Sequence, residues 1–442
     1  YLMMQALAEL AVMYPINGAF TMYIVRFIDP SWGFACGWQY GIGWLTVLPF
    51  EISAACNVEF VLSVMKILAC IGFIILGIII DCGGVPTDTR GYIGTTYWRS
   101  PYSPFLNGFH GFCTVFVTAS FAFGGTELTG LAAAEATDPR KEIPRATKQV
   151  VYRIAIFYIV NLFLVGLIVP ANSPLYSGEG SASRHSPFVI AIELASIFNA
   201  MILISVMSVA NSCTFASTRT FQALAENGMG PKLFAYVDKK GRPVIVVVLQ
   251  LLFGCIAFLN LDTSGGGNIF NWLLALSGLS SFFIFGSIAV AHIRFRAAWK
   301  LQGHSVDELP FKAAFGVWGS YVCAVMNFMC LAAQFYVALW PVGGPNLNVT
   351  IFFQDYLAGP FLVVLYLMWK AYSWFKVPSH RQMWVKIEDI DIYDGMREGQ
   401  ADMISGLDVS EDQRRASIIE MSQENKKKGI KDWGLAAVRT VF

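Results

Sequence analysis

The feature that most constrains the fold is a series of long apolar runs, separated by short polar links, over the first 375 residues. A membrane-spanning helix needs about 20 predominantly apolar residues, because the hydrocarbon core is about 30 Å thick and each residue rises about 1.5 Å. In lipid only helices satisfy their backbone hydrogen bonds locally, so these runs predict an all-α polytopic membrane protein. The expected helices are a stub over 2–13 and spans at about 33–56, 60–80, 109–133, 150–169, 187–210, 244–261, 270–292, 316–340 and 351–374.

The composition excludes several classes of function. Hydrophobic residues make up 55% of the 442 and charged residues only 14%, against about 25% charged in an ordinary soluble domain. The net charge of +1 leaves no basic surplus for nucleic acid. No nucleophile elbow, phosphate-binding loop or metal-ligand spacing is present. We therefore expect an integral membrane protein that is not an enzyme and uses no metal or cofactor.

The distribution of Lys and Arg predicts the orientation, since cytoplasmic links carry an excess of both. Cation-rich links at 140–153, 232–242 and 294–300 alternate with links that hold a single Arg between them. The cation-rich links and the tail, 376–442, are therefore expected to be cytoplasmic. The tail is highly charged and poor in aliphatic residues, so it predicts a solvating or regulatory segment that could bind cytoplasmic partners.

The sharpest functional candidate is the segment from Phe121 to Glu127, in the middle of an expected span. Gly124 and Gly125 each weaken a helix by about 1 kcal/mol relative to Ala and predict a broken helix that offers backbone groups to a ligand. The alternative is that both glycines only admit a neighbouring helix. Glu127 favours the functional interpretation, because packing does not explain an ionisable group there. It would brace the opened segment or exchange a proton.

Other polar residues inside apolar runs leave their roles open. Lys66 could extend its amine to the membrane interface, or its ammonium could stand where a sodium ion sits in ion-driven carriers. Glu51, beside Pro49, could line a cavity or pair with a neighbouring helix. Two serine-rich stripes are more typical of helix packing than of cavity walls. They consist of Ser205, Ser208, Asn211 and Ser212, and of Ser277, Gly278, Ser280 and Ser281.

An ordered set of motifs from Leu7 to about Arg397 resembles the fungal amino acid permeases of the amino acid–polyamine–organocation superfamily. No single motif is decisive, but the series in this order is very hard to obtain by chance. The motifs include residues 9–12, 15–20, 26–29, 32–35, 48–51, 121–127, 139–141, 186–192, 238–243, 271–281, 292–296 and 316–320.

The resemblance implies a twelve-helix fold of two inverted five-helix repeats, of the LeuT-like kind. It also implies proton-driven uptake of L-amino acids across the plasma membrane, with cytoplasmic ends and no cofactor other than the proton gradient. The substrate would lie between opened segments of the first and sixth helices, and 109–133 corresponds to the sixth. The region 271–281 looks more like the broad-range permeases, which hints at general or neutral specificity.

The resemblance also implies roles for individual residues. Lys66 matches the fifth-helix lysine of proton-dependent relatives, so Lys66, Glu127 and Glu51 are candidates for proton coupling or gating. The substrate ammonium would meet carbonyls near 123–126. The substrate-binding candidates are Phe121, Phe123, Gly124, Gly125, Thr126, Ser277 and Gly278.

The sequence also departs from the family pattern, and these departures bear on whether the chain can transport. The link at 23–31 would face inward, so the spans at 33–56 and 60–80 would run in the same direction, which two consecutive spans cannot do. If residues 33–81 formed one helix instead, it would be about 73 Å long, more than twice the hydrocarbon thickness of about 30 Å. We infer a missing span at Cys56–Asn57 and a missing first helix before Tyr1. The expectation is that this chain does not transport whereas its full-length parent does. A non-transporting amino acid receptor and a non-functional truncated permease are the alternatives.

Overall fold

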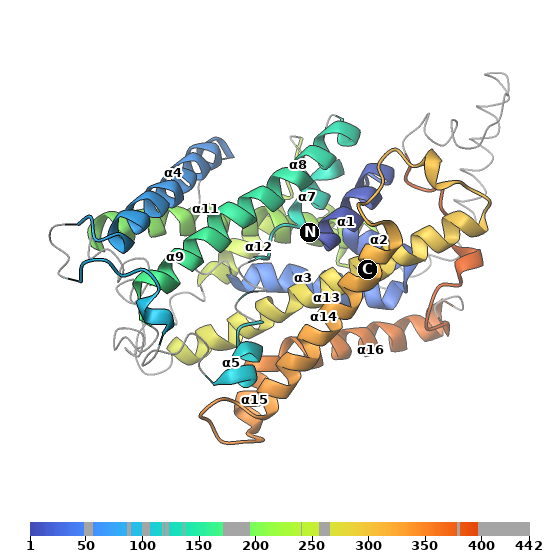
Figure 1. The fold of residues 1–442 in the computed structure, drawn as a ribbon. Coiled ribbons are helices and arrows are strands. Elements are labelled where there is room, and N and C mark those ends of the chain that lie inside the picture. The colour runs from blue at the N-terminus through green and yellow to red at the C-terminus, as the bar shows by residue number, and fades with distance from the viewer. Residues whose placement is uncertain are drawn as a thin grey trace.

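A computed structural model gives the fold of the chain. Within the residues it describes, every regular element is helical (Figure 1). The described residues are 1–47, 56–85, 90–99, 107–116, 119, 123–134, 136, 138–170, 195–239, 241–255, 266–377 and 381–396.

The elements follow one another as a series of long helices joined by short turns. The α-helices are α1 (Leu2–Met13), α2 (Ala19–Phe27), α3 (Pro30–Val47), α4 (Cys56–Asp81), α5 (Gly108–Thr114), α7 (Leu128–Leu131), α8 (Pro139–Arg153), α9 (Asn161–Ile168), α11 (Ala195–Glu226), α12 (Val244–Gly254), α13 (Gly266–Leu301), α14 (Gly316–Leu339), α15 (Val349–Tyr356) and α16 (Ala358–Lys376). A π-helical stretch, η4 (Ile154–Val160), joins α8 to α9, and 3-10 turns lie at η2 (Thr96–Trp98), η3 (Ala132–Ala134), η7 (Lys232–Ala235), η9 (Val306–Glu308) and η11 (Ile387–Asp389).

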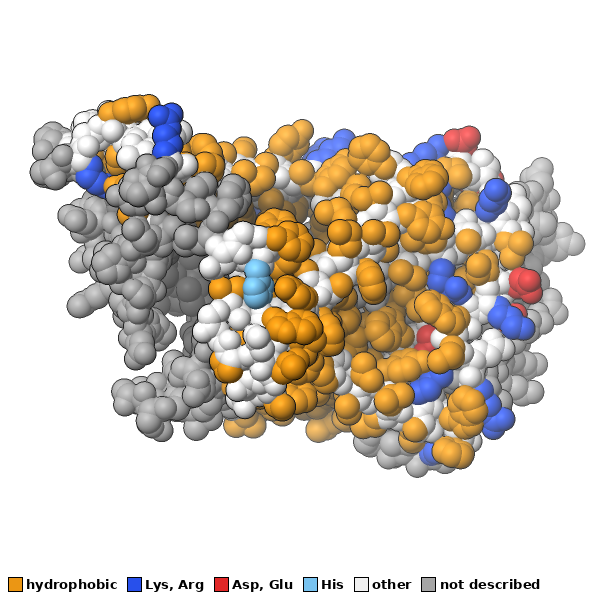
Figure 2. Space-filling view, turned by 60° about the horizontal axis from the view of Figure 1, so that its bottom comes forward, with side chains coloured by type: hydrophobic (Ala, Val, Ile, Leu, Met, Phe, Trp, Pro, Cys, Tyr) orange, Lys and Arg blue, Asp and Glu red, His pale blue; other side chains and the backbone are white. Residues whose placement is uncertain are grey.

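Three helices in the described part of the chain are long and apolar enough to cross a membrane. They are Pro139–Ile168, Leu276–Leu301 and Gly316–Leu339. A fourth candidate is the pair α15 and α16, which are bent by 74° relative to each other. Figure 2 shows that hydrophobic side chains cover most of the face presented there, while the cations gather towards its edges. This surface suits a protein whose solvent is lipid.

Helices α3 and α13 form the centre of the bundle (Figure 1). Helix α3 packs on α2, α11, α13 and α16, and α13 also packs on α1 and α14. An aromatic core lies where the end of α1 meets α13: there Tyr14 packs edge-on against Phe295, with ring centroids 5.7 Å apart. Tyr23 donates a hydrogen bond of 2.5 Å to the carbonyl of Tyr14. These tyrosines are fully buried, so their hydroxyl groups need protein partners.

The expected link at 23–31 is wrong as a link, because residues 19–27 form helix α2. Helix α2 is short and follows α1 after one tight turn, in which Gly18 adopts a left-handed φ of 81°. A span of 20 residues is the signal that hydropathy detects, so a nine-residue buried helix escapes it.

The expected single span at 351–374 is a bent pair instead. Helix α15 ends at Tyr356 and α16 begins at Ala358, beside Gly359. A Cβ atom on Gly359 would lie 2.5 Å from Cε1 of Tyr356, so only glycine permits this approach. Pro360 follows in the first turn of α16, where its missing N–H is not needed. Glycine and proline together therefore allow the sharp bend.

The first part of the charged tail does not behave as a solvated segment. Residues 381–396 fold back against the bundle, where Ile392 is completely buried. The hydroxyl of Tyr14 donates a hydrogen bond of 2.7 Å to the carbonyl of Ile392. Arg26 forms an ion pair of 2.6 Å with Asp394. The tail to residue 396 therefore belongs to the folded domain, and residues 397–442, for which a solvating or regulatory role is predicted, lie outside the described residues.

Candidate functional site

The glycine-containing segment interrupts its helix, as paired glycines in a span predict. Residues 124–127 form turns between Phe123 and helix α7. Gly125 has a φ of 94°, in the left-handed region that side-chain-bearing residues avoid. A Cβ atom there would lie 3.6 Å from the nearest atom of Trp44, which is ordinary contact. Backbone conformation, not crowding, is therefore the reason for glycine at this position.

The side chain of Glu127 points back into this turn and lies within hydrogen-bonding distance of its backbone. It is fully buried and accepts a hydrogen bond of 2.9 Å at Oε1 from the hydroxyl of Tyr40. The backbone N–H of Gly125 lies 3.2 Å from Oε1 and 3.1 Å from Oε2. In the described part of the chain, Glu127 has no lysine or arginine partner. Among the described residues, the donors to this carboxyl group are therefore neutral.

Helix α3 connects this turn to the serine patch on α13. Tyr40 and Trp44 of α3 face the turn, and their rings lie 5.8 Å apart. Gly43 lies between them in sequence, and a Cβ atom on it would approach Oγ of Ser280 to 3.3 Å. Ser280 is itself bonded to the carbonyl of Ser277 at 2.6 Å. The two regions expected to bind substrate thus pack against the same helix.

The substrate candidates on α13 are enclosed by protein. Ser277 and Gly278 are both buried, and Ser280 and Ser281 lie beside them. Phe123, by contrast, is 36% exposed and packs against Tyr158 of η4, with ring centroids 5.5 Å apart. This contact links the turn to the π-helical stretch of the α8–α9 span. Residues of α3 and of η4 therefore pack against the broken helix.

Several predicted residues cannot be placed. Phe121 and Glu51 lie outside the described residues, and so does the whole interval 48–55. Lys66 belongs to helix α4, but its side chain lies outside the described part, as do those of Ser205, Ser208 and Asn211.

A second buried carboxylate was not singled out by sequence. Glu9 of α1 is 1% exposed and lies 2.6 Å from Nε of Arg296 on α13. Nη2 of Arg296 donates to Oε2 at 2.8 Å, and Nε2 of His292 lies 2.9 Å from Oε1. The backbone N–H of Ala313 donates to Oε2 at 2.7 Å. Unlike Glu127, Glu9 is compensated by a cation.

This cluster joins three helices. His292 also contacts Oγ of Ser320 on α14 at 2.8 Å through Nδ1, so α1, α13 and α14 meet at one point. The sequence signal that could have found it is Glu9 inside an apolar stub, together with His292 and Arg296 four residues apart on one helix face. A buried ionised carboxylate is stabilised by a cationic partner, and here an arginine one helical turn from a histidine supplies it.

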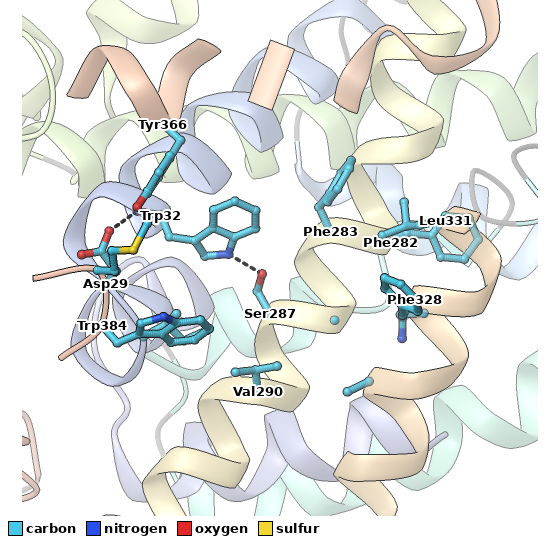
Figure 3. Close-up of a pocket in the computed structure, with 15 residues that line it drawn as sticks. Asp29, Trp32, Phe282, Phe283, Ser287, Val290, Phe328, Leu331, Tyr366 and Trp384 are labelled. Carbon is cyan, nitrogen blue, oxygen red and sulfur yellow. Dashed lines mark hydrogen bonds between the residues drawn. The ribbon is translucent and has the colours of Figure 1, made fainter. Parts of the chain in front are cut away.

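Two cavities in the described part of the chain lie away from these residues. The first, of about 420 Å³, lies between α3, α13, α14, α16 and the folded tail, and Figure 3 shows its lining. The second, of about 520 Å³, adjoins it at Trp384. Neither is lined by residues 123–127 or by Ser277 and Gly278. No group of three or more potential metal-ligating side chains occurs among the residues described.

Comparison with known sequences identifies a family. The chain matches the sequence profile of the family described as amino acid permease over residues 1–58 and 56–382. The two matches meet at residues 56–58, where the sequence indicates a missing span.

Individual relatives match most of the chain. The cationic amino acid transporter 1 of Schizosaccharomyces pombe is 43% identical over 458 residues, which cover 93% of this chain and 75% of the relative. The amino acid transporter 1 of the same yeast is 44% identical and covers 90% and 74% respectively. The general amino-acid permease GAP1 of Saccharomyces cerevisiae is 43% identical, with coverage of 91% and 73%.

Proposed function

Because this chain belongs to the amino acid permease family, we propose that its full-length parent takes up L-amino acids across the plasma membrane together with protons. Amino acid transport by an integral membrane protein is the activity of the family. The finer statements are ours: import, proton coupling, a general or neutral range of substrates, and a cytoplasmic tail. The observation that carries them is the buried carboxyl group of Glu127, held by neutral donors at a break in a helix.

The broken helix supports a role in substrate binding. Turns at residues 124–127 replace the regular i to i−4 hydrogen bonding: the carbonyls of Gly125 and Thr126 accept from the N–H groups of Leu128 and Thr129, and each keeps a second lone pair for a ligand ammonium. Gly125 keeps the backbone approachable because it has no side chain. We assign the substrate ammonium to carbonyls between Phe123 and Thr126. The aromatic ring of Phe123, which is partly exposed, would cover the bound side chain.

Glu127 is the group on the described part of the chain that we assign to proton exchange. It can gain or lose a proton without breaking an ion pair, because Tyr40 and Gly125 are neutral donors. Glu9 is a poor candidate by the same test, since protonating it would leave Arg296 buried without its counter-ion. Lys66 and Glu51 remain proposed contributors to coupling on the strength of sequence.

A broad substrate range is the simplest expectation for the serine patch. Ser277 and Gly278 are small, and neither brings a charge that would select a cationic or anionic side chain. The names of the relatives point in two directions, since one is a cationic transporter and another a general permease. The proposal therefore commits to amino acids as a class, with neutral side chains preferred.

Uptake in permease-deficient cells tests the proposal. The full-length parent, expressed in these cells, should accumulate radiolabelled neutral L-amino acids, and a proton uncoupler should abolish accumulation. Glu127→Gln should reach the membrane normally but lose accumulation against a gradient, whereas Glu308→Gln, an exposed carboxylate far along the chain, should not. Uptake that ignores the uncoupler would refute proton coupling. Absence of uptake with normal surface delivery would favour a receptor.

A further inference from the structure

The 420 Å³ cavity is a wedge between two helices that separate. Helix α15 packs on α14, where the ring of Phe335 lies 5.8 Å from Phe352 and 5.4 Å from Tyr356. Helix α16 packs on α3 instead, where Phe34 and Trp369 stack with centroids 4.1 Å apart. The 74° bend between α15 and α16 therefore directs α16 away from α14. The space left between them has α13 as its floor.

The lining of this wedge is almost entirely apolar and aromatic. Figure 3 shows Trp32 and Trp384 on one side of the gap and Phe282 and Phe328 on the other, with α13 between them. The volume falls in the range of about 300–1,000 Å³ that is usual for small-molecule sites. Phe328 is 71% exposed, so the wedge is open at the surface of the bundle. In an integral membrane protein, that surface faces lipid.

The polar groups of the lining already have protein partners. Oγ of Ser287 accepts a hydrogen bond of 2.8 Å from the indole of Trp32. The amide of Asn327 donates to the carbonyl of Cys323 at 2.8 Å within its own helix. Asp29 is paired with Lys370 at 2.9 Å. A cationic ligand would therefore find no free carboxylate among these aromatic rings, and the occupant must be apolar along its length.

The second cavity, of about 520 Å³, has charged residues in its lining and adjoins the first; we call it the mouth of the wedge. The two share Trp384, and the second is lined by Arg294, Lys386 and Glu388. Arg294 is held in place by bonds to the carbonyls of Phe27 and Val385, and its guanidinium lies 5.6 Å over the ring of Trp384.

Lys386 at this mouth is exposed. Its side chain makes no hydrogen bond or ion pair with any residue that the structure describes, although its carbonyl accepts from the N–H of Asp389. Two cations against one carboxylate leave this mouth with a positive charge.

From an apolar wedge that adjoins a cationic mouth at Trp384, we infer that the chain binds an acidic glycerophospholipid. One acyl chain occupies the space between α14 and α16, and the net negative charge of the headgroup meets Lys386 and Arg294. The mouth lies at the cation-rich end of α13, which the proposed orientation places at the cytoplasmic leaflet, where anionic lipids concentrate. The inference rests on membrane insertion and on this orientation, and it is independent of whether the chain transports amino acids.

The folded tail is part of this site. Met383 and Trp384 line the wedge, and the carbonyl of Gln382 accepts a bond of 2.6 Å from Lys370. Bound lipid would therefore contact both the last helix and the segment after it. The site assembles only when residues 381–396 are docked.

Lipid titration of the purified chain tests the inference. The chain in detergent is titrated with dioleoyl phosphatidylserine or dioleoyl phosphatidylcholine, and bound lipid is counted by native mass spectrometry. We expect phosphatidylserine to bind about fivefold more tightly, the effect of one cation at an anionic headgroup. Lys386→Glu should abolish this preference and leave phosphatidylcholine binding unchanged. Lys312→Glu, which alters an exposed cation elsewhere, should behave as wild type.

A cavity-filling variant tests the position of the acyl chain. Ala324→Trp should reduce binding of both phospholipids at least tenfold, because Ala324 lines the wedge. Val325→Trp, on the next residue but exposed and outside the lining, should not. A photoreactive phosphatidylserine with its label at the chain end should cross-link within 282–290 or 324–331 of the wild-type chain.

Three outcomes would overturn the inference. Equal affinity for the two phospholipids would remove the acidic headgroup from the proposal. Cross-links confined to other helices would remove the wedge. Displacement of bound phospholipid by ergosterol at equal concentration, with no effect of Lys386→Glu, would assign the wedge to a sterol. Lys386→Glu changes an exposed side chain, so it remains informative if Ala324→Trp fails to fold.

Discussion

The hydroxyl of Tyr40 on α3 donates a 2.9 Å hydrogen bond to the buried carboxyl group of Glu127 at the broken helix. Tyr40 is held in turn by edge-on packing against Phe20, with ring centroids 4.9 Å apart. A change in the charge or position of Glu127 would therefore alter a direct contact with α3. Because α3 also contacts the serine patch of α13, this bond couples the proposed proton site to both sides of the proposed substrate site.

Tyr40→Phe should lower amino acid uptake without unfolding the protein. The substitution keeps the ring and removes one donor to Glu127, and a hydrogen bond to an ionisable group contributes about 1.5–3 kcal/mol. We expect initial uptake rates to fall about tenfold or more at equal surface expression, with a shifted pH dependence. Tyr236→Phe, at an exposed position, is the matched control. Wild-type rates and pH dependence in Tyr40→Phe would mean that the bond has no part in transport.

Gly125→Ala should destabilise the protein more than Gly124→Ala. Only Gly125 of the two has a positive φ, and a left-handed conformation costs a side-chain-bearing residue about 1–2 kcal/mol. Space is available at Gly125, so strain in the backbone is the expected cause. Thermal unfolding in detergent micelles measures the difference. Equal midpoints for the two variants would show that this turn relaxes at no cost.

Arg296→Met should destabilise the protein by about 3–5 kcal/mol, because it leaves Glu9 buried without its cation. Adding Glu9→Gln should restore a large part of this stability, since the amide oxygen still accepts from the N–H of Ala313. The coupling is read from a double-mutant cycle of unfolding free energies. Arg153→Met, at an exposed cation, serves as the control. Additive effects would mean that the pair is not coupled.

Ile392→Ala should release the docked tail. Truncating a fully buried Ile costs about 2–5 kcal/mol, and here the cost falls on the docking of residues 381–396. Trypsin should then cleave at the exposed Arg381 and Lys386 at least about thirtyfold faster, if cleavage follows the open population. Val306→Ala, at an exposed position, should leave cleavage unchanged. If Ile392→Ala were cleaved at the wild-type rate, other contacts of residues 381–396 would have to supply the docking energy.

The loop at 305–308 should lose order in acid. Glu308 accepts from the backbone N–H of Ser305 at 2.8 Å and lies 2.9 Å from His304, and these contacts lower the pKa of its carboxyl group below the usual 4.5. A depressed pKa contributes stability above about pH 4.5 that is lost as the pH falls through the folded-state pKa. Hydrogen exchange at Ser305, corrected for intrinsic rates, should show severalfold lower protection at pH 3 than at pH 6. Glu308→Gln should remove this pH dependence, whereas Glu388→Gln should not.

Much of the helical organisation follows from apolar run length alone. Helices α4, α13 and α14 cover the expected spans at 60–80, 270–292 and 316–340. Run length says nothing about direction, so it did not foresee that α15 and α16 follow different neighbours. The Gly359–Pro360 pair was visible in the sequence, but its effect depends on the ring of Tyr356 against which Gly359 packs. A bend of this kind is a tertiary property.

The sequence could point to a residue of the candidate site only where that residue type is unusual for the run that contains it. Glu127 beside paired glycines is anomalous in an apolar run, and the structure places it in a turn. Tyr40 is not anomalous, because a tyrosine among the aromatic residues of α3 is indistinguishable from a packing residue. Glu9 and Arg296 lie 287 positions apart, so their pairing could not be read from local spacing. Contacts between residues so far apart in the sequence can be identified only when the fold is known.

The docked tail also has a consequence for biosynthesis. Ile392 meets Tyr14 across 378 positions, so the aromatic core laid down by the first helices stays incomplete while most of the chain is being made. The ribosome will have synthesised the described helices from α1 to α16 before the segment that closes this core emerges. A nascent chain that stops after α16 would therefore leave the hydroxyl of Tyr14 without the carbonyl of Ile392 that accepts its hydrogen bond.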